Sequence, residues 1–449
     1  MKNIIILISL LVGSNSLLYG DIPSSKQKSK IQCNMTVKYI KRPKNVDSLS
    51  QLLTDGMFYG RFRTNNSIYE KIDKSGDSIN LGGSLLYKSA RYKHLSFTSS
   101  IYFNNNKKDT ILTSAQSYIA YTKSRVKVKL GRFLIETLLA KSHDTGMIPN
   151  AFEGAYLKSS IISKNKIQLA YLTKQKLNSH DKFHHLLAFD ENDDGAMHRG
   201  ITLEKLNEKN IKDRLIIFEI ENRNIKNLNL LLNYTSVPKL LSLLSIEGKI
   251  KFKNRSGLLI KPAIRYTHQF DNGAGEIGGA NLRDDTRGYN NPNSLTSSIL
   301  LSRVDFQYKS ASLRLAYSKV ADKGDIVAPW QSAPTIGYTS AMSQKNWYAN
   351  SSTVMIRGDY SFSSDTPLNG MHIVGRYAIE NFDDNKPSQS SDKNLYTLDF
   401  IKRFKSNPNL MVKLRTKFER ERYRIQNSDK SYKKSPYSNE VRLEINYLF

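Results

Sequence analysis

The feature that most constrains the fold is the strict alternation of apolar and polar residues at the end of the chain, over residues 440–449. A period of two is typical of a β-strand with one apolar and one polar face. Such a strand suits the wall of a membrane barrel, apolar toward lipid and polar toward water. An amphipathic edge strand of a soluble sandwich is the alternative. The apolar face carries Val441, Leu443, Ile445, Tyr447 and Phe449, and the polar face carries Glu440, Arg442, Glu444 and Asn446.

Residues 1–20 predict a secretory signal peptide. Lys2 precedes an apolar run over residues 4–12, and small and polar residues follow as far as Gly20. We expect cleavage near Gly20, with Ser16 as the alternative. The apolar run is too short to span a bilayer, and no later segment predicts a transmembrane helix. An exported chain without a helical anchor can still cross a membrane as a barrel, because a barrel pairs every backbone group.

The composition is compatible with a barrel. About 430 residues after processing is large for one soluble core, but ordinary for a barrel of sixteen to eighteen strands. Hydrophobic residues make up only 39% of the chain, as expected if alternate residues alone face lipid. The 25 Tyr and 18 Phe residues suit aromatic girdles at the membrane surfaces. Cys33 is the single cysteine, which excludes a disulfide within the chain.

The net charge of +28 has several interpretations. A basic pore, nucleic-acid binding and contact with anionic headgroups would each favour it, and so would an AT-rich genome. Export and the lack of a basic cluster on a helix argue against nucleic acid. Genome bias would scatter lysines through loops, so the positions of basic residues along strands decide between the remaining readings.

The chain predicts an all-β fold: a transmembrane antiparallel β-barrel of about eighteen strands, with short periplasmic turns and long extracellular loops. Residues 21–55 predict a periplasmic segment with a short helix, and residues 56–449 the barrel. Nineteen candidate strands can be recognised, but such barrels have an even number, so one candidate is wrong. The weakest lies in 228–252, where Pro238 breaks the alternation. The candidates begin near Met57, Ile79, Lys93, Ser114, Arg125, Ala151, Lys166, Met197, Asp213, Leu228, Leu240, Gly257, Ser297, Ser310, Ser351, Gly370, Asn394, Asn409 and Tyr437.

Two motifs resemble the OprD-type outer-membrane porins. A strand ending in Leu130-Gly131-Arg132 leads through residues 142–144 (SHD) to residues 147–154 (MIPNAFEG), and residues 55–63 (DGMFYGRFR) are similar to the family's first strand. The terminal Phe449 resembles the signal by which bacterial outer-membrane proteins engage the barrel assembly machinery. The resemblance covers roughly residues 49–449. It implies an eighteen-stranded channel for small, often carboxylate-bearing nutrients, with a ladder of basic residues along one wall.

Alternation places many basic residues on the polar face in mid-strand. A Lys or Arg that faced lipid at the midplane would cost about 2–4 kcal/mol, so these side chains are expected to line water. Cationic rings lower the barrier for anions, and Arg can hold a carboxylate bidentately. A generic hydrated lining is the alternative. The predicted ladder comprises Arg61, Arg63, Lys127, Lys129, Arg265, Arg303, Arg314, Arg357, Arg376, Lys413, Arg415 and Lys417.

The loop 134–150 is the candidate constriction. It carries Glu136, Lys141, His143 and Asp144, and the family resemblance implies that it folds into the barrel. Acids opposite a basic wall would orient dipolar solutes. An ordinary surface loop is the alternative.

Metal sites are weakly indicated, and we predict no metal and no cofactor. His180, His184 and His185 share a loop with Asp181, a set able to bind a transition metal, although a solvated loop is favoured. Residues 190–195 (DENDDG) match the start of a calcium loop, but Ile201 stands where an EF-hand needs Glu, which rejects that motif. An irregular calcium site in 190–195 stays open, and the acidic stretch 276–285 is equally ambiguous.

The function predicted from the sequence is passive diffusion of small anionic or zwitterionic solutes through an outer-membrane porin. An enzyme is not expected, because no Gly-x-Ser-x-Gly motif occurs and the histidines lie mainly in loops. A plugged barrel acting as a surface adhesin or structural protein is the alternative. The expected partners are small solutes, outer-membrane lipid and lipopolysaccharide, and the assembly machinery through Phe449, but not nucleic acid. Monomer and trimer both stay open. A plug domain before Met57 is not expected.

Overall fold

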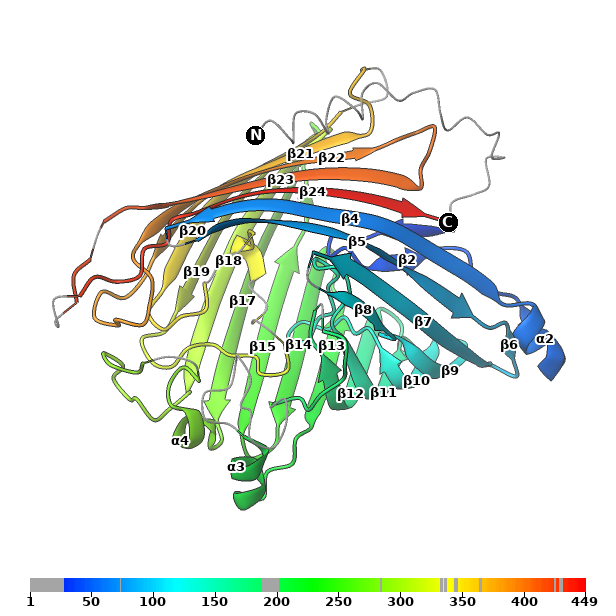
Figure 1. Cartoon of the computed structure of the whole chain (residues 1–449), viewed down its shortest axis with the longest axis horizontal. Coiled ribbons are helices and arrows are strands. Elements are labelled where there is room, and N and C mark those ends of the chain that lie inside the picture. Colours follow the sequence, from blue (N-terminus) through cyan, green and yellow to red (C-terminus); the bar gives the residue numbers. More distant parts are fainter. Residues whose placement is uncertain are drawn as a thin grey trace.

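The alternating segments form one closed antiparallel barrel of eighteen wall strands (Figure 1). The computed structural model describes residues 28–72, 74–107, 109–178, 180–187, 202–282, 285–331, 334, 337–342, 346–362, 366–423, 425–427 and 431–449. The predicted signal peptide lies outside the described residues. None of the described helices is long and apolar enough to cross a membrane.

Each wall strand pairs with its neighbours in sequence order. Two wall strands are interrupted, because β8 and β9 both pair with β7, and β15 and β16 both pair with β17. The strands are β4 (Met57–Lys71), β5 (Ser75–Lys88), β7 (Leu95–Asn106), β8 (Thr110–Thr113), β9 (Ser117–Lys123), β10 (Val126–Phe133), β11 (Ala151–Ser159), β12 (Asn165–Lys176), β13 (Leu215–Asn222), β14 (Leu228–Val237), β15 (Leu241–Ile250), β16 (Phe252–Lys253), β17 (Leu259–Asp271), β18 (Ser297–Tyr308), β19 (Ala311–Val320), β20 (Ser352–Ser361), β21 (Met371–Asn381), β22 (Lys393–Arg403), β23 (Leu410–Glu421) and β24 (Ser438–Leu448).

The barrel closes where the last strand meets the first. In the β24–β4 ladder Leu448 lies opposite Arg61. Beyond the strand end, Phe449 donates its backbone N–H to the carbonyl of Gly60 (3.1 Å) and accepts from the N–H of Gly60 (3.0 Å). The Phe449 ring stacks on Phe62 with centroids 5.2 Å apart. A side chain at residue 60 would collide with this ring unless the ring moved, so glycine leaves room for the ring where it lies.

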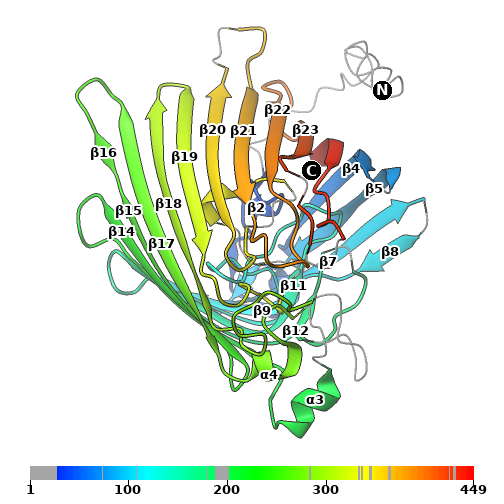
Figure 2. The ribbon, with the colours of Figure 1, turned by 90° about the vertical axis from the view of Figure 1, so that its left-hand side faces the viewer.

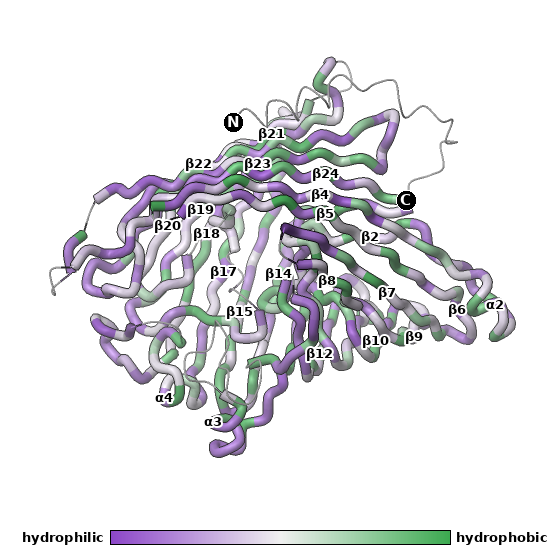
Figure 3. The backbone as a smooth tube through the Cα atoms, in the orientation of Figure 1, coloured by the Kyte–Doolittle hydropathy of each residue, from purple (hydrophilic) through white to green (hydrophobic). Residues whose placement is uncertain are grey.

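The two faces of the wall differ as the alternation predicts. Outward residues such as Phe62, Leu130 and Ile264 are more than half exposed, whereas Glu444 and Asn446 are fully buried inside. Figure 3 shows the same alternation of hydrophobic and hydrophilic residues along the strands. The fold class predicted from the sequence is confirmed.

The connections differ in length between the two rims. One rim, which holds both ends of the wall, has short turns, including those at 124–125 and 309–310. The opposite rim carries loops 134–150, 177–214, 272–296, 321–351, 382–392 and 422–437, together with three short turns at 72–74, 107–109 and 238–240. In Figure 1 helix α2 (Leu49–Thr54) marks the first rim, and α3 (Leu203–Glu208) and α4 (Ala274–Gly278) mark the second. The 3-10 turn η1 (Gly337–Thr339) belongs to loop 321–351.

The surplus strand predicted from the sequence is not the one near Pro238. β14 and β15 both form, because Pro238 and Lys239 (φ 65°) occupy the tight turn between them, where the missing N–H of proline costs no ladder bond. The strand predicted from Met197 is the wrong one. Its start lies outside the described residues, and its continuation is α3, whose first turn is capped by the Thr202 side chain.

The segment before the wall lies partly inside the barrel, which differs from the periplasmic position predicted for residues 21–55. β1 (Ser29–Ile31) and β2 (Val37–Tyr39) form a hairpin, and Figure 2 shows β2 within the barrel. Ile31 and Met35 of this hairpin pack on Met411 and Leu448, which project inward. β3 (Asn45–Val46) pairs with β6 (Arg91–Tyr92) at the rim, next to the exposed helix α2. A hairpin that precedes Met57 therefore enters the barrel.

Candidate pore constriction

Loop 134–150 lies inside the barrel, where Asp144 meets two arginines of β4. Its carboxylate oxygens lie 2.8 Å from Arg61 Nη1 and 2.7 Å from Arg63 Nη1. All three side chains are almost completely buried, and Glu444 lies 3.7 Å from the second arginine. Charge-assisted hydrogen bonds of this length in a buried site are strong. They fix the loop against the closing seam of the wall.

The other predicted residues of this loop have different surroundings. Glu136 and Lys141 pair with each other at 3.3 Å and are partly exposed. His143 places Nδ1 3.0 Å from the Thr145 hydroxyl. Burial lowers the pKa of His143, and the neighbouring Asp144 carboxylate opposes the shift. The structure therefore brings Asp144 to the basic wall, whereas Glu136 and Lys141 pair only with each other.

The N-terminal hairpin meets this loop in the lumen. The Asn34 side-chain amide donates to the carbonyl of Ser142 (2.9 Å), and the backbone N–H of Asp144 donates to the carbonyl of Asn34 (2.8 Å). Arg61 also donates to the carbonyl of Met35 (2.9 Å). Sequence reasoning missed this contact, because the hairpin strands are only three residues long and give no readable alternation.

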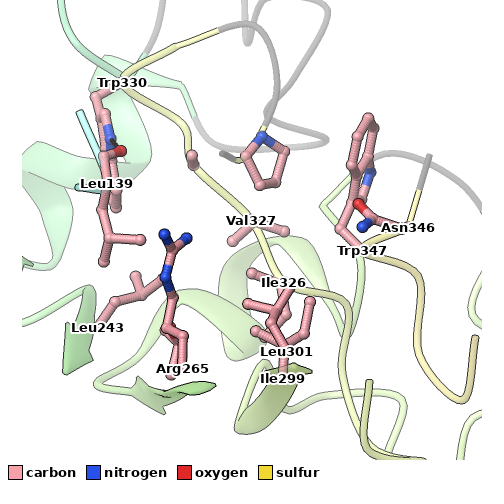
Figure 4. Close-up of a pocket in the computed structure, with 13 residues that line it drawn as sticks. Leu139, Leu243, Arg265, Ile299, Leu301, Ile326, Val327, Trp330, Asn346 and Trp347 are labelled. Atoms are coloured by element: carbon pink, nitrogen blue, oxygen red, sulfur yellow. Dashed lines mark hydrogen bonds between the residues drawn. The ribbon is translucent and has the colours of Figure 1, made fainter. Parts of the chain in front are cut away.

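Loop 321–351 also folds inward, which sequence reasoning did not predict. The indole of Trp330 is fully buried and donates from Nε1 to the carbonyl of Leu139 (3.1 Å). Figure 4 shows Trp330 beside Leu139, with Arg265 and the wall residue Leu243 below them. The void between them, about 20 Å³, holds roughly one water. Both tryptophans of the chain lie in this loop, a signal that could have indicated burial.

Two further loops on this rim, 177–214 and 272–296, contribute to the same apolar cluster. Leu186, Leu187, Leu206 and Leu282 are fully or almost fully buried in it. Parts of four long loops therefore pack together as a second core.

Most of the predicted basic ladder is paired with carboxylates on the same inner face, which sequence reasoning did not consider. The acids lie on the same or the neighbouring strand, and Asp305 and Asp399 are each shared by two arginines, so part of the positive charge remains. The N···O distances are 2.6 Å for Arg265–Glu247, 3.4 Å for Arg303–Asp305, 2.5 Å for Arg314–Asp305, 2.5 Å for Arg357–Asp359, 3.0 Å for Arg376–Asp399, 3.2 Å for Arg415–Asp399 and 3.0 Å for Lys417–Glu419.

A group of lysines on β5, β10 and β11 is different. Lys127 lies opposite Lys158 in the ladder. These two lysines form no ion pair with any described residue, and the same holds for Lys88 and Lys129. The ammonium of Lys129 lies 4.9, 5.4 and 5.5 Å from three aromatic ring centroids. That of Lys88 lies 3.9 Å from the ring of Tyr39. We call Lys88, Lys127, Lys129 and Lys158 the lysine cluster.

Lys413 is an intermediate case. Its ammonium lies 3.9 Å from Met35 Sδ of the hairpin and forms no ion pair within the described part of the chain. It therefore lies beside the hairpin, apart from the lysine cluster.

The candidate metal residues make local contacts instead. The rings of His180 and His184 lie in a tilted contact with centroids 5.7 Å apart, and His185 pairs with Asp213 at 3.2 Å. No group of three or more His, Cys, Asp or Glu suited to a metal occurs among the described residues. The acidic stretch 276–285 contributes Glu276, which pairs with Lys209 at 3.2 Å. Residues 190–195 lie outside the described residues.

No protein-family model matches the sequence, and no curated protein matches it either. Solved structures do match. Pseudomonas aeruginosa OccD3 (OpdP) has a TM-score of 0.68 at 15% identity, covering 91% of this chain and 95% of that one. OccK8 (OprE) of the same organism has a TM-score of 0.71 at 11% identity, covering 89% and 99%. OpdK, solved with vanillate, has a TM-score of 0.68 at 13% identity, covering 89% and 99%.

The closed eighteen-stranded wall with loops packed inside it is the architecture of an outer-membrane porin. The solved structures that it resembles belong to the OprD/Occ porins. The chain shares the fold of that family, as residues 130–132 and 147–154 predict.

Proposed function

We propose that this chain forms a passive outer-membrane channel for small anionic or zwitterionic solutes, such as carboxylates, amino acids or small peptides. The barrel fold and its likeness to porin channels support a channel rather than an enzyme. Outer-membrane lipid and lipopolysaccharide surround it, and Phe449 presents the end of the closing strand to the assembly machinery.

The lysine cluster is the observation that carries the solute class. Lys127, Lys129 and Lys158 have no carboxylate partner among the described residues, so no acid of the chain competes with a passing anion for these side chains. Cationic linings lower the electrostatic barrier for anions. The paired basic residues contribute a smaller net potential, because five carboxylates offset part of their charge, and each pair presents a dipole to a zwitterionic solute.

The narrow part of the channel is formed by two segments that enter the barrel from opposite rims. Loop 134–150 enters from the long-loop rim and the β1–β2 hairpin from the other, and Asp144 and Asn34 join them. Asp144 lies between Arg61 and Arg63. Because these contacts are buried, they hold the constricting segments in place and do not meet a passing solute.

Planar-bilayer recording tests the proposal. In a salt gradient the wild type should give discrete current steps with an anion-leaning reversal potential. The triple variant K127Q/K129Q/K158Q should move that potential toward zero. The matched control K74Q/K212Q/K239Q loses equal charge from exposed positions at the long-loop rim and should keep it. Vanillate, which accompanies OpdK in its structure, is a suitable first aromatic carboxylate for a block assay.

One observation favours the second candidate, a non-conducting surface or structural barrel. The inward loops share a continuous apolar cluster that includes Trp330, Leu139 and Leu282. A folded barrel that never conducts would replace the channel proposal with this one, and loss of surface binding on loop deletion would then support adhesion.

A further inference from the structure

The short-turn rim carries a ring of positive charge that the channel does not use. Eight turns join wall strands there, at 89–94, 124–125, 160–164, 223–227, 254–258, 309–310, 362–370 and 404–409. All of them except 362–370 carry Lys or Arg in their described residues. We call these side chains the basic collar; its exposed members include Arg125, Lys164, Lys226, Arg255, Lys309 and Lys405.

The collar has few counter-charges. The described residues of the eight turns contain no Asp or Glu, while Asp47 and Asp55 flank α2 at this rim and Asp365 lies outside the described residues. Within the described part of the chain, Arg223 is the single collar residue in an ion pair, at 2.6 Å from Glu221. Positive side chains gathered with few acids repel one another, so an external anion would stabilise them.

The opposite rim shows that this asymmetry is not a matter of composition. Loops there contain exposed lysines too, but their described residues also contain acids, as in the pair of Lys209 with Glu276. A genome that favours lysine would act on both rims alike. The separation of acids from bases along the barrel axis therefore calls for a partner at the short-turn rim.

Exposed apolar side chains stand beside the collar charges. Ile161 (64%), Ile162 (58%) and Ile225 (57%) flank Lys164 and Lys226 in their turns. Neighbouring aromatic rings lie next to lysines as well, since Lys309 is 5.3 Å from the ring centroid of Tyr308. Apolar residues beside long cationic ones are typical of positions at a membrane surface, where the charge reaches the headgroups and the apolar part faces the acyl chains.

We propose that the basic collar binds anionic phospholipid headgroups of the leaflet that faces the periplasm. In an outer-membrane barrel the short turns are periplasmic, so the collar lies at the headgroup level of that leaflet. The proposal rests on the placement of the barrel in the membrane, not on conduction. Exposed isoleucines and tyrosine among the charges favour a lipid surface over a soluble acidic protein or a cell-wall polymer.

Native mass spectrometry of the purified full chain tests this inference. The protein in neutral detergent is titrated with equal amounts of phosphatidylglycerol and phosphatidylcholine, at low and high ionic strength. The collar variant K164Q/K226Q/K309Q/K405Q is compared with the control K74Q/K212Q/K239Q/K323Q, which removes four exposed lysines from the long-loop rim.

We expect the wild type and the control to retain phosphatidylglycerol in preference to phosphatidylcholine, most strongly at low salt. The collar variant should lose roughly tenfold or more of that preference, because each lysine near an anionic surface contributes appreciably to binding. Equal loss in both variants, or no preference in the wild type, would overturn the proposal. So would a collar variant that keeps its lipid preference but no longer binds isolated cell-wall sacculi, since the partner would then be a cell-wall polymer.

Discussion

Inside the barrel, the backbone N–H of Asp144 donates a hydrogen bond to the backbone carbonyl of Asn34 (2.8 Å). One residue belongs to a hairpin that enters at the short-turn rim, the other to a loop that enters at the long-loop rim. Arg61 contacts both segments, because its Nη1 donates to the Met35 carbonyl and to the Asp144 carboxylate. A single wall side chain therefore holds the two segments together.

Replacing Arg61 should loosen both segments. In R61Q the buried Asp144 keeps only one arginine partner, which we expect to cost about 1–3 kcal/mol of stability and to raise single-channel conductance. R357Q is the matched control, since its Arg357–Asp359 pair contacts neither segment. Planar-bilayer steps and thermal unfolding measure the two effects. Equal conductance in R61Q and wild type would show that the segments do not limit the current.

Cys33 offers a direct probe of the hairpin. It is exposed beside Asn34, at the tip of the hairpin. A negatively charged methanethiosulfonate reagent should therefore react with it, lower the current and weaken the preference for anions. The C33S variant should not respond. If the reagent changes both proteins alike, or neither, the hairpin tip does not lie in the conducting path.

Acidic pH should destabilise loop 134–150 through His143. Because burial lowers its pKa, the folded loop binds a proton less readily than the unfolded chain, whose pKa is about 6.5. The stability that this histidine contributes is present above that value and is lost as the pH falls through the folded pKa. Thermal unfolding from about pH 7 to about pH 5 should show a larger drop for the wild type than for H143Q. Parallel pH profiles would contradict this assignment.

The contact of Gly60 with Phe449 should be sensitive to a single methyl group. In G60A the new Cβ would meet the Phe449 ring at 1.8 Å unless the ring moves, and overpacking of this kind costs about 1–3 kcal/mol. G358A is the control, because nothing lies within 4 Å of a Cβ at that outward position. The temperature at which the folded barrel unfolds and changes its mobility on a gel should be lower in G60A only. A similar shift in both variants would mean that the seam tolerates the methyl group.

The sequence predicted those features that follow from local alternation. The alternating faces of residues 440–449 and the closed wall agree with the structure. Contacts between distant segments were beyond this reasoning. No period relates Asp399 to Arg376 and Arg415, so these paired arginines were interpreted as free charges. The strand predicted from Met197 was wrong, because a few alternating residues before a capped helix look like a strand.

The seam between β24 and β4 has a consequence for biogenesis. Gly60 lies near the start of the wall, and its backbone partner is Phe449, the last residue of the chain. A nascent or truncated chain can pair every intermediate strand and still expose two unpaired strand edges, which are templates for aggregation. The wall therefore closes only when β24 pairs with β4, and no pairing among the strands between them removes the two open edges. Until that pairing, the chain carries both edges unprotected.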